Sequence, residues 1–283
     1  MDVTSVSVVG TGTMATGIVQ VLAQSGIPVT MVGRSQSSIE DALATIRRNL
    51  QRGVERERMT ADDMELSLSL VVPTTRYDGI AETDMVIEAV SEDMVVKAEV
   101  FERVDDLVKE LALIASNTSS ISITSLASLT SRPDRVIGMH FFNPVPVMQL
   151  VEVVRGLATS DEAVETTARL TTRIGKTPVE VNDFPGFVSN RVLMPMINEA
   201  VYCLMEGVAT RENIDSVMKL GMNHPMGPLA LADLIGLDVC LDILEVLHRD
   251  IGDPKYRPCP LLRKVVAAGK LGRKSGEGFF EYR

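Results

Sequence analysis

A histidine and a glutamate in the middle of the chain have side chains suited to taking the proton of an alcohol as it is oxidised, and a serine follows a neighbouring strand-like run. Ser119 and His140 each follow an apolar run typical of a buried strand, and Glu152 lies among aliphatic residues in the next such run. Histidine can take a hydroxyl proton and return it near neutral pH, and an adjacent carboxylate would orient its ring and favour its protonated form. Because a carboxylate among aliphatic residues needs a partner, the sequence predicts that Glu152 pairs with His140.

Each of these residues also has a purely structural interpretation. A lone histidine before two phenylalanines, as in His140-Phe141-Phe142, can be packed in a core. A lone serine after a strand, such as Ser119, is more often a turn or cap residue than a catalytic one. Spacing alone leaves both interpretations open.

A glycine-rich segment near the start of the chain matches the G-x-G-x-x-G/A pattern of dinucleotide-binding folds. It lies between a β-branched run and a helix-prone stretch, and a second strand-like run follows, which is the order of a βαβ unit. The first glycine allows a tight turn, the second lets the backbone approach a pyrophosphate, and the third position needs a small residue. The phosphates would bind at the helix N-terminus, where free N–H groups and the helix dipole attract anions. The residues expected to contact the dinucleotide here are Gly10, Gly12, Thr13, Met14 and Ala15.

The residues at the end of the second strand help to distinguish NAD(H) from NADP(H) as the ligand. NAD-binding folds usually place an acidic residue there, about 20 residues past the glycines, to accept hydrogen bonds from the ribose hydroxyls. Here the strand ends in Gly33-Arg34-Ser35, so the acid is missing, while Arg34 and Ser35 offer donors suited to a phosphate. These residues favour NADP(H) over NAD(H). The alternative is that Arg34 is a solvated surface side chain and that NAD binds without its usual acidic partner.

Alternating strand-like and helix-prone runs must position these residues. The strand candidates are Val3–Val9, Val29–Val32, Leu70–Val72, Met85–Glu88, Ala112–Ser116, Val136–Met139, Leu150–Val154 and Thr177–Val181. Helix-prone stretches lie between them, at 13–25, 36–68 and 95–109. This alternation predicts an α/β fold with a Rossmann-like, doubly wound, mostly parallel sheet covered by helices on both faces. Side chains that follow such strands, as Ser119 and His140 do, face the ligand crevice.

Near residue 183 the alternation of strand-like and helix-prone runs ends. Beyond it the chain shows long helical patterns, at Phe187–Glu206, Arg211–Leu220, Leu229–Arg249 and Leu261–Ala268. We therefore expect a dinucleotide-binding domain over residues 1–183, with a helical excursion at about 36–68, and an all-helical domain over residues 184–283.

Composition narrows the classes of partner. The formal net charge is −10, which argues against nucleic acid, since a binder of DNA or RNA needs a basic face. Cys203, Cys240 and Cys259 form no C-x-x-C pair, so the sequence indicates neither a disulfide scaffold nor a metal site. It shows no apolar stretch long enough to cross a bilayer and no targeting pattern. The expected location is the cytoplasm, away from membranes.

Segments along the whole chain resemble one enzyme family. They read GTGTMATGI, VIEAVSEDMVVK, SNTSSISI, HFFNPVPVMQLVEVV, GKTPVEVNDFPGFVSNR, NHPMGPLALADLIGLD and KLGRKSGEGFFEY. They are similar to segments of the L-3-hydroxyacyl-CoA dehydrogenases, above all the stand-alone bacterial 3-hydroxybutyryl-CoA dehydrogenases. The resemblance implies hydride transfer between nicotinamide and an (S)-3-hydroxyacyl-CoA/3-oxoacyl-CoA pair, such as 3-hydroxybutyryl-CoA and acetoacetyl-CoA. It also implies a homodimer formed through the helical domain.

The resemblance further implies roles for single residues. His140 would be the general acid/base with Glu152 as its partner, and Ser119 and Asn190 would bind the reacting oxygens of the substrate. The coenzyme would contact Ala89, Glu92, Lys97, Asn143 and Lys274. These roles add to the dinucleotide-binding residues expected from the glycine-rich segment.

The resemblance places CoA binding on the helical excursion, where this acidic protein is locally basic. Asn49 and Arg56 match the positions that contact CoA in the family, and further arginines lie nearby. The alternative is that these arginines form a solvated face balanced by Glu55 and Glu57.

Other functions are compatible with the same fold. A catalytically silent dinucleotide-binding sensor or structural protein is one, because fold does not determine function. Against it, all four residues that the reaction requires are present, namely Ser119, His140, Glu152 and Asn190. A β-hydroxyacid dehydrogenase of the related two-domain type would need a lysine base near the start of the second domain, and residues 186–191 contain none.

Overall fold

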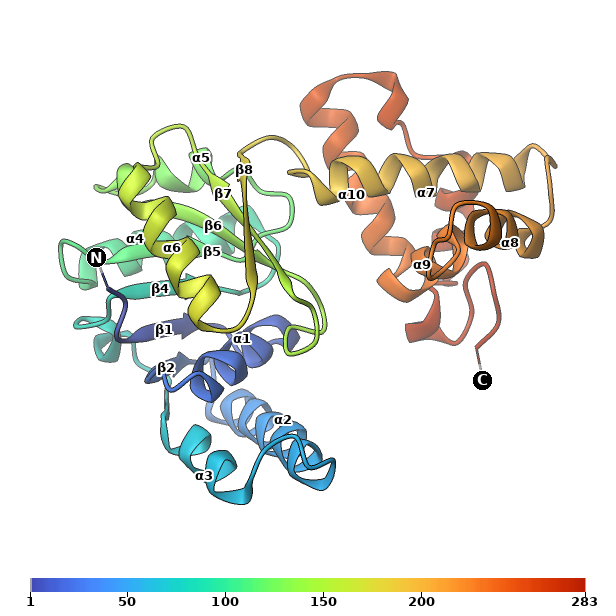
Figure 1. The fold of residues 1–283 in the computed structure, drawn as a ribbon. Coiled ribbons are helices and arrows are strands. Elements are labelled where there is room, and N and C mark those ends of the chain that lie inside the picture. The colour runs from blue at the N-terminus through green and yellow to red at the C-terminus, as the bar shows by residue number, and fades with distance from the viewer. Residues whose placement is uncertain (1, 283) are drawn as a thin grey trace. The chain divides into compact units, whose positions relative to one another are not determined.

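A computed structural model describes residues 2–282, and in it the chain falls into two units, Met1–Asp183 and Phe184–Arg283 (Figure 1). The first is built on a β-sheet and is called the sheet unit below. The second consists largely of helices and is called the helical unit. Each has its own cluster of buried apolar side chains.

The sheet unit contains eight strands in the order β3-β2-β1-β4-β5-β6-β7-β8. Their bounds are β1 (Val6–Val9), β2 (Val29–Val32), β3 (Val71–Thr74), β4 (Met85–Glu88), β5 (Leu113–Ser116), β6 (Val136–Phe141), β7 (Leu150–Arg155) and β8 (Thr177–Asn182). Neighbouring strands run parallel except β6 and β7, which are antiparallel. All residues of β1, β4, β5 and β6 are buried, as expected for strands covered on both faces. The predicted Rossmann-like, mostly parallel sheet is therefore confirmed.

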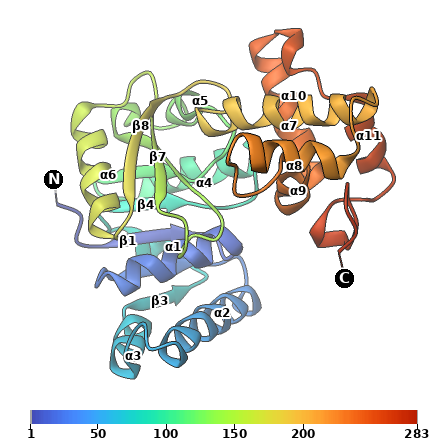
Figure 2. The same cartoon turned by 45° about the vertical axis from the view of Figure 1, so that its right-hand side comes forward.

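Most helices of the sheet unit cover the faces of the sheet, and two of them form the excursion. They are α1 (Thr13–Gln24), α2 (Gln36–Glu55), α3 (Ala61–Ser69), α4 (Met94–Leu107), α5 (Ile123–Ala127) and α6 (Asp161–Arg173), with short 3₁₀ turns η1 (Tyr77–Ile80) and η2 (Pro133–Arg135). Helices α4 and α6 lie on opposite faces of the sheet (Figure 2). The excursion consists of α2 and α3, which pack against α1. Helix α2 buries Ile39, Ala42, Ile46 and Leu50, spaced three or four residues apart, and so leaves its polar face to solvent.

The helical unit is held together by buried aliphatic side chains of its longer helices. Its elements are α7 (Ser189–Met205), α8 (Arg211–Gly221), α9 (Pro228–Ile235), α10 (Leu237–Ile251), η3 (Pro254–Tyr256), α11 (Pro260–Ala267) and η4 (Arg273–Ser275). Met194 and Val201 of α7 and Leu244 and Leu247 of α10 are completely buried. Within residues 2–282, no helix combines the length and the apolar character that crossing a membrane would require.

Most expected elements differ from the observed ones by only one or two residues at their ends, so that β6 extends to Phe141 and contains His140, but two differ more. The first strand begins at Val6 instead of Val3, because Asp84 Oδ2 accepts the backbone N–H groups of Thr4 (2.7 Å) and Ser5 (3.0 Å). The single helix expected over 229–249 is two helices, α9 and α10. Gly236 separates them with a φ of 109°, which no helical residue adopts.

The tight turn after β1 generates a first prediction. Gly10 has a φ of 133°, and a Cβ there would lie 2.4 Å from the carbonyl oxygen of Ala89. We expect Gly10→Ala to lower the free energy of unfolding by about 2–4 kcal/mol, because backbone strain adds to a clash with backbone. Urea denaturation followed by circular dichroism measures the change.

Gly26→Ala is the matched control for that substitution. Gly26 also has a positive φ, of 73°, but among the described residues no atom lies within 4 Å of a Cβ placed there. It should lower the free energy of unfolding by only about 1 kcal/mol. Equal effects of the two substitutions would show that crowding against Ala89 contributes nothing.

Candidate active site

A histidine and a glutamate face each other on the two antiparallel strands. His140, near the end of β6, is the register partner of Glu152, near the start of β7. His140 Nδ1 lies 2.8 Å from Glu152 Oε2, and both residues are buried, at 7% and 2% exposed. The pairing expected from the sequence is therefore present. The carboxylate holds the ring through Nδ1, which directs proton exchange with any substrate to Nε2.

The loop after β5 carries Ser119 and is tied to the end of β6. Asn117 Oδ1 accepts the backbone N–H of Phe141 at 3.0 Å, next to His140. Ser119 itself is half-buried. Both Ser119 and His140 thus follow or end neighbouring parallel strands, β5 and β6, at the edge where ligands bind in open α/β sheets.

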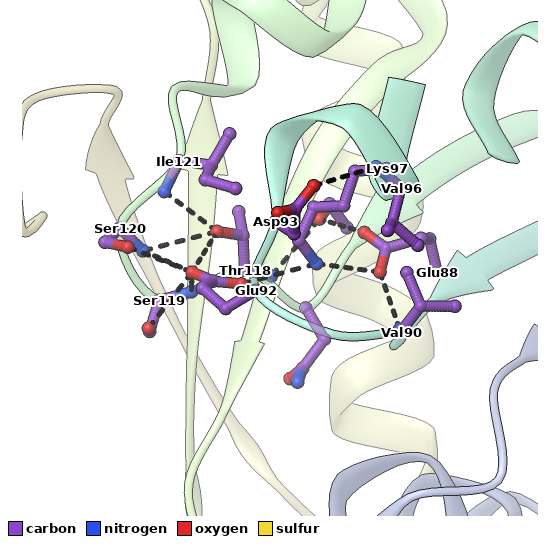
Figure 3. Close-up of polar contacts among 12 residues, drawn as sticks. Glu88, Val90, Glu92, Asp93, Val96, Lys97, Thr118, Ser119, Ser120 and Ile121 are labelled. Atoms are coloured by element: carbon purple, nitrogen blue, oxygen red, sulfur yellow. Dashed lines mark hydrogen bonds and ion pairs between the residues drawn. The ribbon is translucent and has the colours of Figure 1, made fainter. Parts of the chain in front are cut away.

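An ion-pair network beside this loop joins the buried Lys97 and Glu88 to Glu92, whose side chain is 38% exposed (Figure 3). Lys97 Nζ, on the first turn of α4, contacts Glu88 Oε1 at 2.7 Å and Glu92 Oε2 at 3.3 Å. Glu92 Oε1 accepts the backbone N–H of Ser119 at 2.9 Å. Burial raises the pKa of Glu92, but the Lys97 ammonium and the hydrogen bonds from residues 118–120 outweigh it, so the pKa lies below that of an ordinary glutamate. Glu92 is therefore ionised at neutral pH.

The glycine-rich turn has the features of a phosphate site. Helix α1 begins directly after Gly12, which as N-cap offers no side chain to its first N–H groups. Among the described residues, no atom lies within 4 Å of a Cβ built on Gly12, so a ligand can approach the backbone there. Ala15 is completely buried, as the close packing of helix and strand requires. Thr13 is exposed and Met14 half-buried at this helix start.

The end of β2 shows why position 33 is glycine. Gly33 is buried, and a Cβ there would lie 2.4 Å from Cγ1 of Ile39 and 2.9 Å from Cγ2 of Thr11. Arg34 is exposed, and Ser35 caps α2 by accepting the N–H of Ser38. No side chain therefore fits at position 33 without a shift of Ile39, while Arg34 and Ser35 stay accessible.

Two grooves adjoin this region. One, of about 240 Å³, is lined by residues of the glycine turn, α1 and α2, together with Asn143. The other, of about 420 Å³, is lined by exposed Arg56 and neighbouring arginines of the excursion. Asn49 lines both grooves and donates to Gln20 Oε1 at 3.1 Å. The locally basic segment thus borders a cavity.

The β6–β7 loop, which forms a wall of both grooves, is held by a lysine. Nζ of Lys176 donates to the carbonyl oxygens of Val145 (2.6 Å) and Met148 (2.7 Å). Burial lowers the pKa of Lys176. The peptide bond between Asn143 and Pro144 in this loop is cis.

Two of the expected site residues belong to the helical unit. Asn190 is in the first turn of α7 and is buried. Lys274, in η4, forms an ion pair with Asp238 of α10. Their expected contacts with substrate and coenzyme stay predictions.

Sequence reasoning did not single out Asn117, Glu88 or Lys176. Asn117 and Glu88 lie in segments noted for other residues, and each is the last residue of a strand or follows one. A charged residue in an otherwise apolar strand, as Glu88 is, signals a buried partner. Lys176 gave no comparable signal, because its partners are backbone carbonyls.

Comparison with known proteins covers both units. Residues 5–184 match the family model described as the NAD-binding domain of 3-hydroxyacyl-CoA dehydrogenase. Residues 186–282 match the model of the C-terminal domain of the same enzyme. Together the two matches span nearly the whole chain.

Individual relatives are similar from end to end. A probable 3-hydroxybutyryl-CoA dehydrogenase of Bacillus subtilis is 53% identical, covering 100% of this chain and 98% of its own. A 3-hydroxybutyryl-CoA dehydrogenase of Clostridioides difficile is 52% identical, with 98% of each chain covered. The crystal structure of (S)-3-hydroxybutyryl-CoA dehydrogenase from Ralstonia eutropha superimposes with a TM-score of 0.98 at 50% identity, over 100% of both chains.

The buried ion pair generates a second prediction. Lys97 and Glu88 have side chains only 1% exposed, so Lys97→Met would leave a buried carboxylate without its counter-ion. We expect the free energy of unfolding to fall by about 3–5 kcal/mol, measured by urea denaturation.

The double variant Lys97→Met/Glu88→Gln should recover at least half of that loss, because it removes the unpaired charge. Lys109→Met is the control, since the Lys109–Asp84 pair is 38% exposed on the lysine side and should contribute about 1 kcal/mol or less. A Lys97→Met protein as stable as the Lys109→Met protein would contradict the prediction.

Proposed function

The chain belongs to the 3-hydroxyacyl-CoA dehydrogenase family, and on this premise we propose that it interconverts (S)-3-hydroxybutyryl-CoA and acetoacetyl-CoA with a nicotinamide coenzyme. The observation that carries the proposal is the buried contact of 2.8 Å between His140 Nδ1 and Glu152 Oε2, next to the loop of Ser119. The high identity to enzymes described as 3-hydroxybutyryl-CoA dehydrogenases supports the short acyl chain.

His140 is assigned the proton transfer. In oxidation, Nε2 takes the proton of the 3-hydroxyl group as hydride leaves carbon 3, and in reduction it returns that proton to the 3-oxo oxygen. Glu152 keeps the ring oriented and stabilises the imidazolium formed when the proton is on Nε2. Both steps need the same nitrogen, which suits a reversible reaction.

Ser119 and Asn190 are assigned to the oxygens of the substrate. The Ser119 hydroxyl is a donor for the 3-oxo oxygen, whose negative charge grows as hydride arrives. Asn190 carries an amide that can donate in the same way, and family resemblance assigns it this task. Asn49 and Arg56, on the grooves beside α2, are assigned to CoA.

The residues of the glycine turn fit a dinucleotide. The open space at Gly12 and the uncapped start of α1 suit a pyrophosphate, and Ala89 borders the turn at Gly10. Asn143 lies on the groove beside this turn and would hold the nicotinamide end. When bound, the nicotinamide supplies or accepts the hydride.

We assign a preference for NADP(H), although the matching family model is described as NAD-binding. Support comes from the buried Gly33, which leaves no carboxylate to repel a 2′-phosphate, and from the exposed Arg34 and Ser35 beside it. A guanidinium can form two parallel hydrogen bonds with a phosphate.

We also assign a cytoplasmic homodimer formed through the helical unit. Val217, Leu220 and Met222, in and just after α8, are exposed at 61%, 86% and 61%. Apolar side chains grouped in this way are typical of a surface that another subunit covers.

The proposed chemistry predicts the effect of two substitutions. His140→Gln should lower kcat for reduction of acetoacetyl-CoA by about 10²–10⁴-fold, because the proton donor is lost. Glu152→Gln should lower it less, since an amide can still contact the ring. Nicotinamide absorbance measures turnover, and coenzyme fluorescence should show an unchanged dissociation constant.

His248→Gln, on α10, is the control and should keep normal turnover. Normal turnover of His140→Gln would remove that residue from the mechanism. If the unaltered protein turned over no 3-oxoacyl-CoA with either coenzyme, the silent sensor would be the better explanation.

The coenzyme assignment makes a separate prediction. The unaltered protein should have a higher kcat/KM with NADPH than with NADH, and Arg34→Gln should lower the NADPH value by about 10–100-fold through loss of a charge-assisted contact. The NADH value should change by less than about twofold. Arg47→Gln, which removes another exposed arginine, is the control. A preference for NADH that Arg34→Gln leaves unchanged would refute the assignment.

A further inference from the structure

The loop between β4 and α4 reaches the loop that carries Ser119 through one carboxylate oxygen (Figure 3). Glu92 Oε1 accepts the backbone N–H groups of Ser119 (2.9 Å) and Ser120 (3.1 Å) and the hydroxyl of Thr118 (2.6 Å). The hydroxyls of Ser119 (3.2 Å) and Ser120 (3.0 Å) also point to this oxygen. Five donors therefore converge on a single atom.

These donors are not held equally. The two N–H groups and the Thr118 hydroxyl lie at ordinary hydrogen-bond distances, whereas the Ser119 hydroxyl, at 3.2 Å, lies beyond the usual O–H···O distance of about 2.7–2.8 Å. Glu92 thus fixes the backbone on both sides of Ser119 more firmly than it fixes the hydroxyl. The loop is therefore anchored mainly through its backbone, which sets the position from which the Ser119 side chain extends.

The second carboxylate oxygen of Glu92 is held by an ion pair. Its Oε2 contacts Lys97 Nζ, which contacts Glu88 Oε1, and Glu88 Oε2 accepts the hydroxyl of Ser116 at 2.6 Å. Ser116 in turn accepts the N–H of Thr118 at 3.2 Å. The ends of β4 and β5 are therefore joined by a closed set of contacts that passes through Glu92.

The two oxygens of Glu92 have different partners, and both partners are donors. A glutamine in its place would offer only one acceptor oxygen. Its NH₂ group would then face either the ammonium of Lys97 or the N–H groups of Ser119 and Ser120, none of which can accept a hydrogen bond, and only the hydroxyls of residues 118–120 could accept one. A glutamine would therefore keep the size of the side chain but lose either the contact with Lys97 or those with the two N–H groups.

We propose that Glu92 is a positioning residue for the reaction, which acts by holding Ser119 where its hydroxyl can meet the reacting oxygen of the substrate. This role rests on the function proposed above. It differs from a direct contact with the coenzyme, the role that family resemblance implies for the same residue.

A double-mutant cycle tests the role. Glu92→Gln should lower kcat for acetoacetyl-CoA by about tenfold or more and change the coenzyme dissociation constant by less than about twofold. If Glu92 acts through Ser119, the Ser119→Ala/Glu92→Gln protein should be no slower than Ser119→Ala alone, within about twofold.

Hydrogen exchange supplies a readout that does not need turnover. In Glu92→Gln the amides of residues 118–120 should exchange faster, while peptides of the helical unit keep their protection and show that the protein is folded. Asp105→Asn is the matched control, because Asp105 also accepts a backbone N–H, from Ser131, and pairs with a basic residue, Arg132. It should leave both kcat and the exchange of residues 118–120 unchanged.

Three outcomes would overturn the role. They are kcat losses that add in the double variant, a weakened coenzyme affinity with normal kcat at saturation, and unchanged exchange of residues 118–120. Absence of turnover in the unaltered protein would instead refute the proposed function, and with it the catalytic part of this role. The two failures are therefore distinguishable.

Discussion

The antiparallel pairing of β6 with β7 is the constraint on which the candidate site depends. It places His140 opposite Glu152, because a residue near the end of one strand meets a residue near the start of the next. It also requires the chain to reverse between them, and this reversal forms the wall of both grooves, held by Lys176. A parallel β7 would separate the two side chains by the length of the strand.

Two buried lysines stabilise the sheet unit, each through a different kind of contact. Lys97 lies between two carboxylates, whereas Nζ of Lys176 donates to two backbone carbonyls. Burial lowers the pKa of Lys176, because its ammonium loses solvation that the two carbonyl oxygens replace only in part. Both lysines connect loops at the ligand-binding edge to the rigid sheet, which is how an α/β fold can place catalytic side chains accurately on loops.

Much of the fold and of the site could be predicted from the sequence. Strand and helix patterns identified the sheet, and the need of a buried carboxylate for a partner identified the contact of Glu152 with His140. Local patterns could not show that β7 runs antiparallel or that Gly236 divides a helix. Nor could they show that Asp84 binds the N–H groups of Thr4 and Ser5, because these features depend on contacts between distant segments.

Packing around Gly33, just after β2, restricts which residue can occupy the place where dinucleotide-binding folds usually carry an acid. An aspartate at position 33 would collide with Ile39 before its charge could act on any ribose. An aspartate there requires the Ile39 side chain to shift or to be shortened, and shortening it removes buried apolar contact from the start of α2. Substitutions at positions 33 and 39 should therefore not have additive effects on stability, because a side chain at position 33 would contact that of residue 39. The exposed Arg34, to which the coenzyme preference is assigned in the proposal, meets no such packing constraint, so its substitution leaves the core intact.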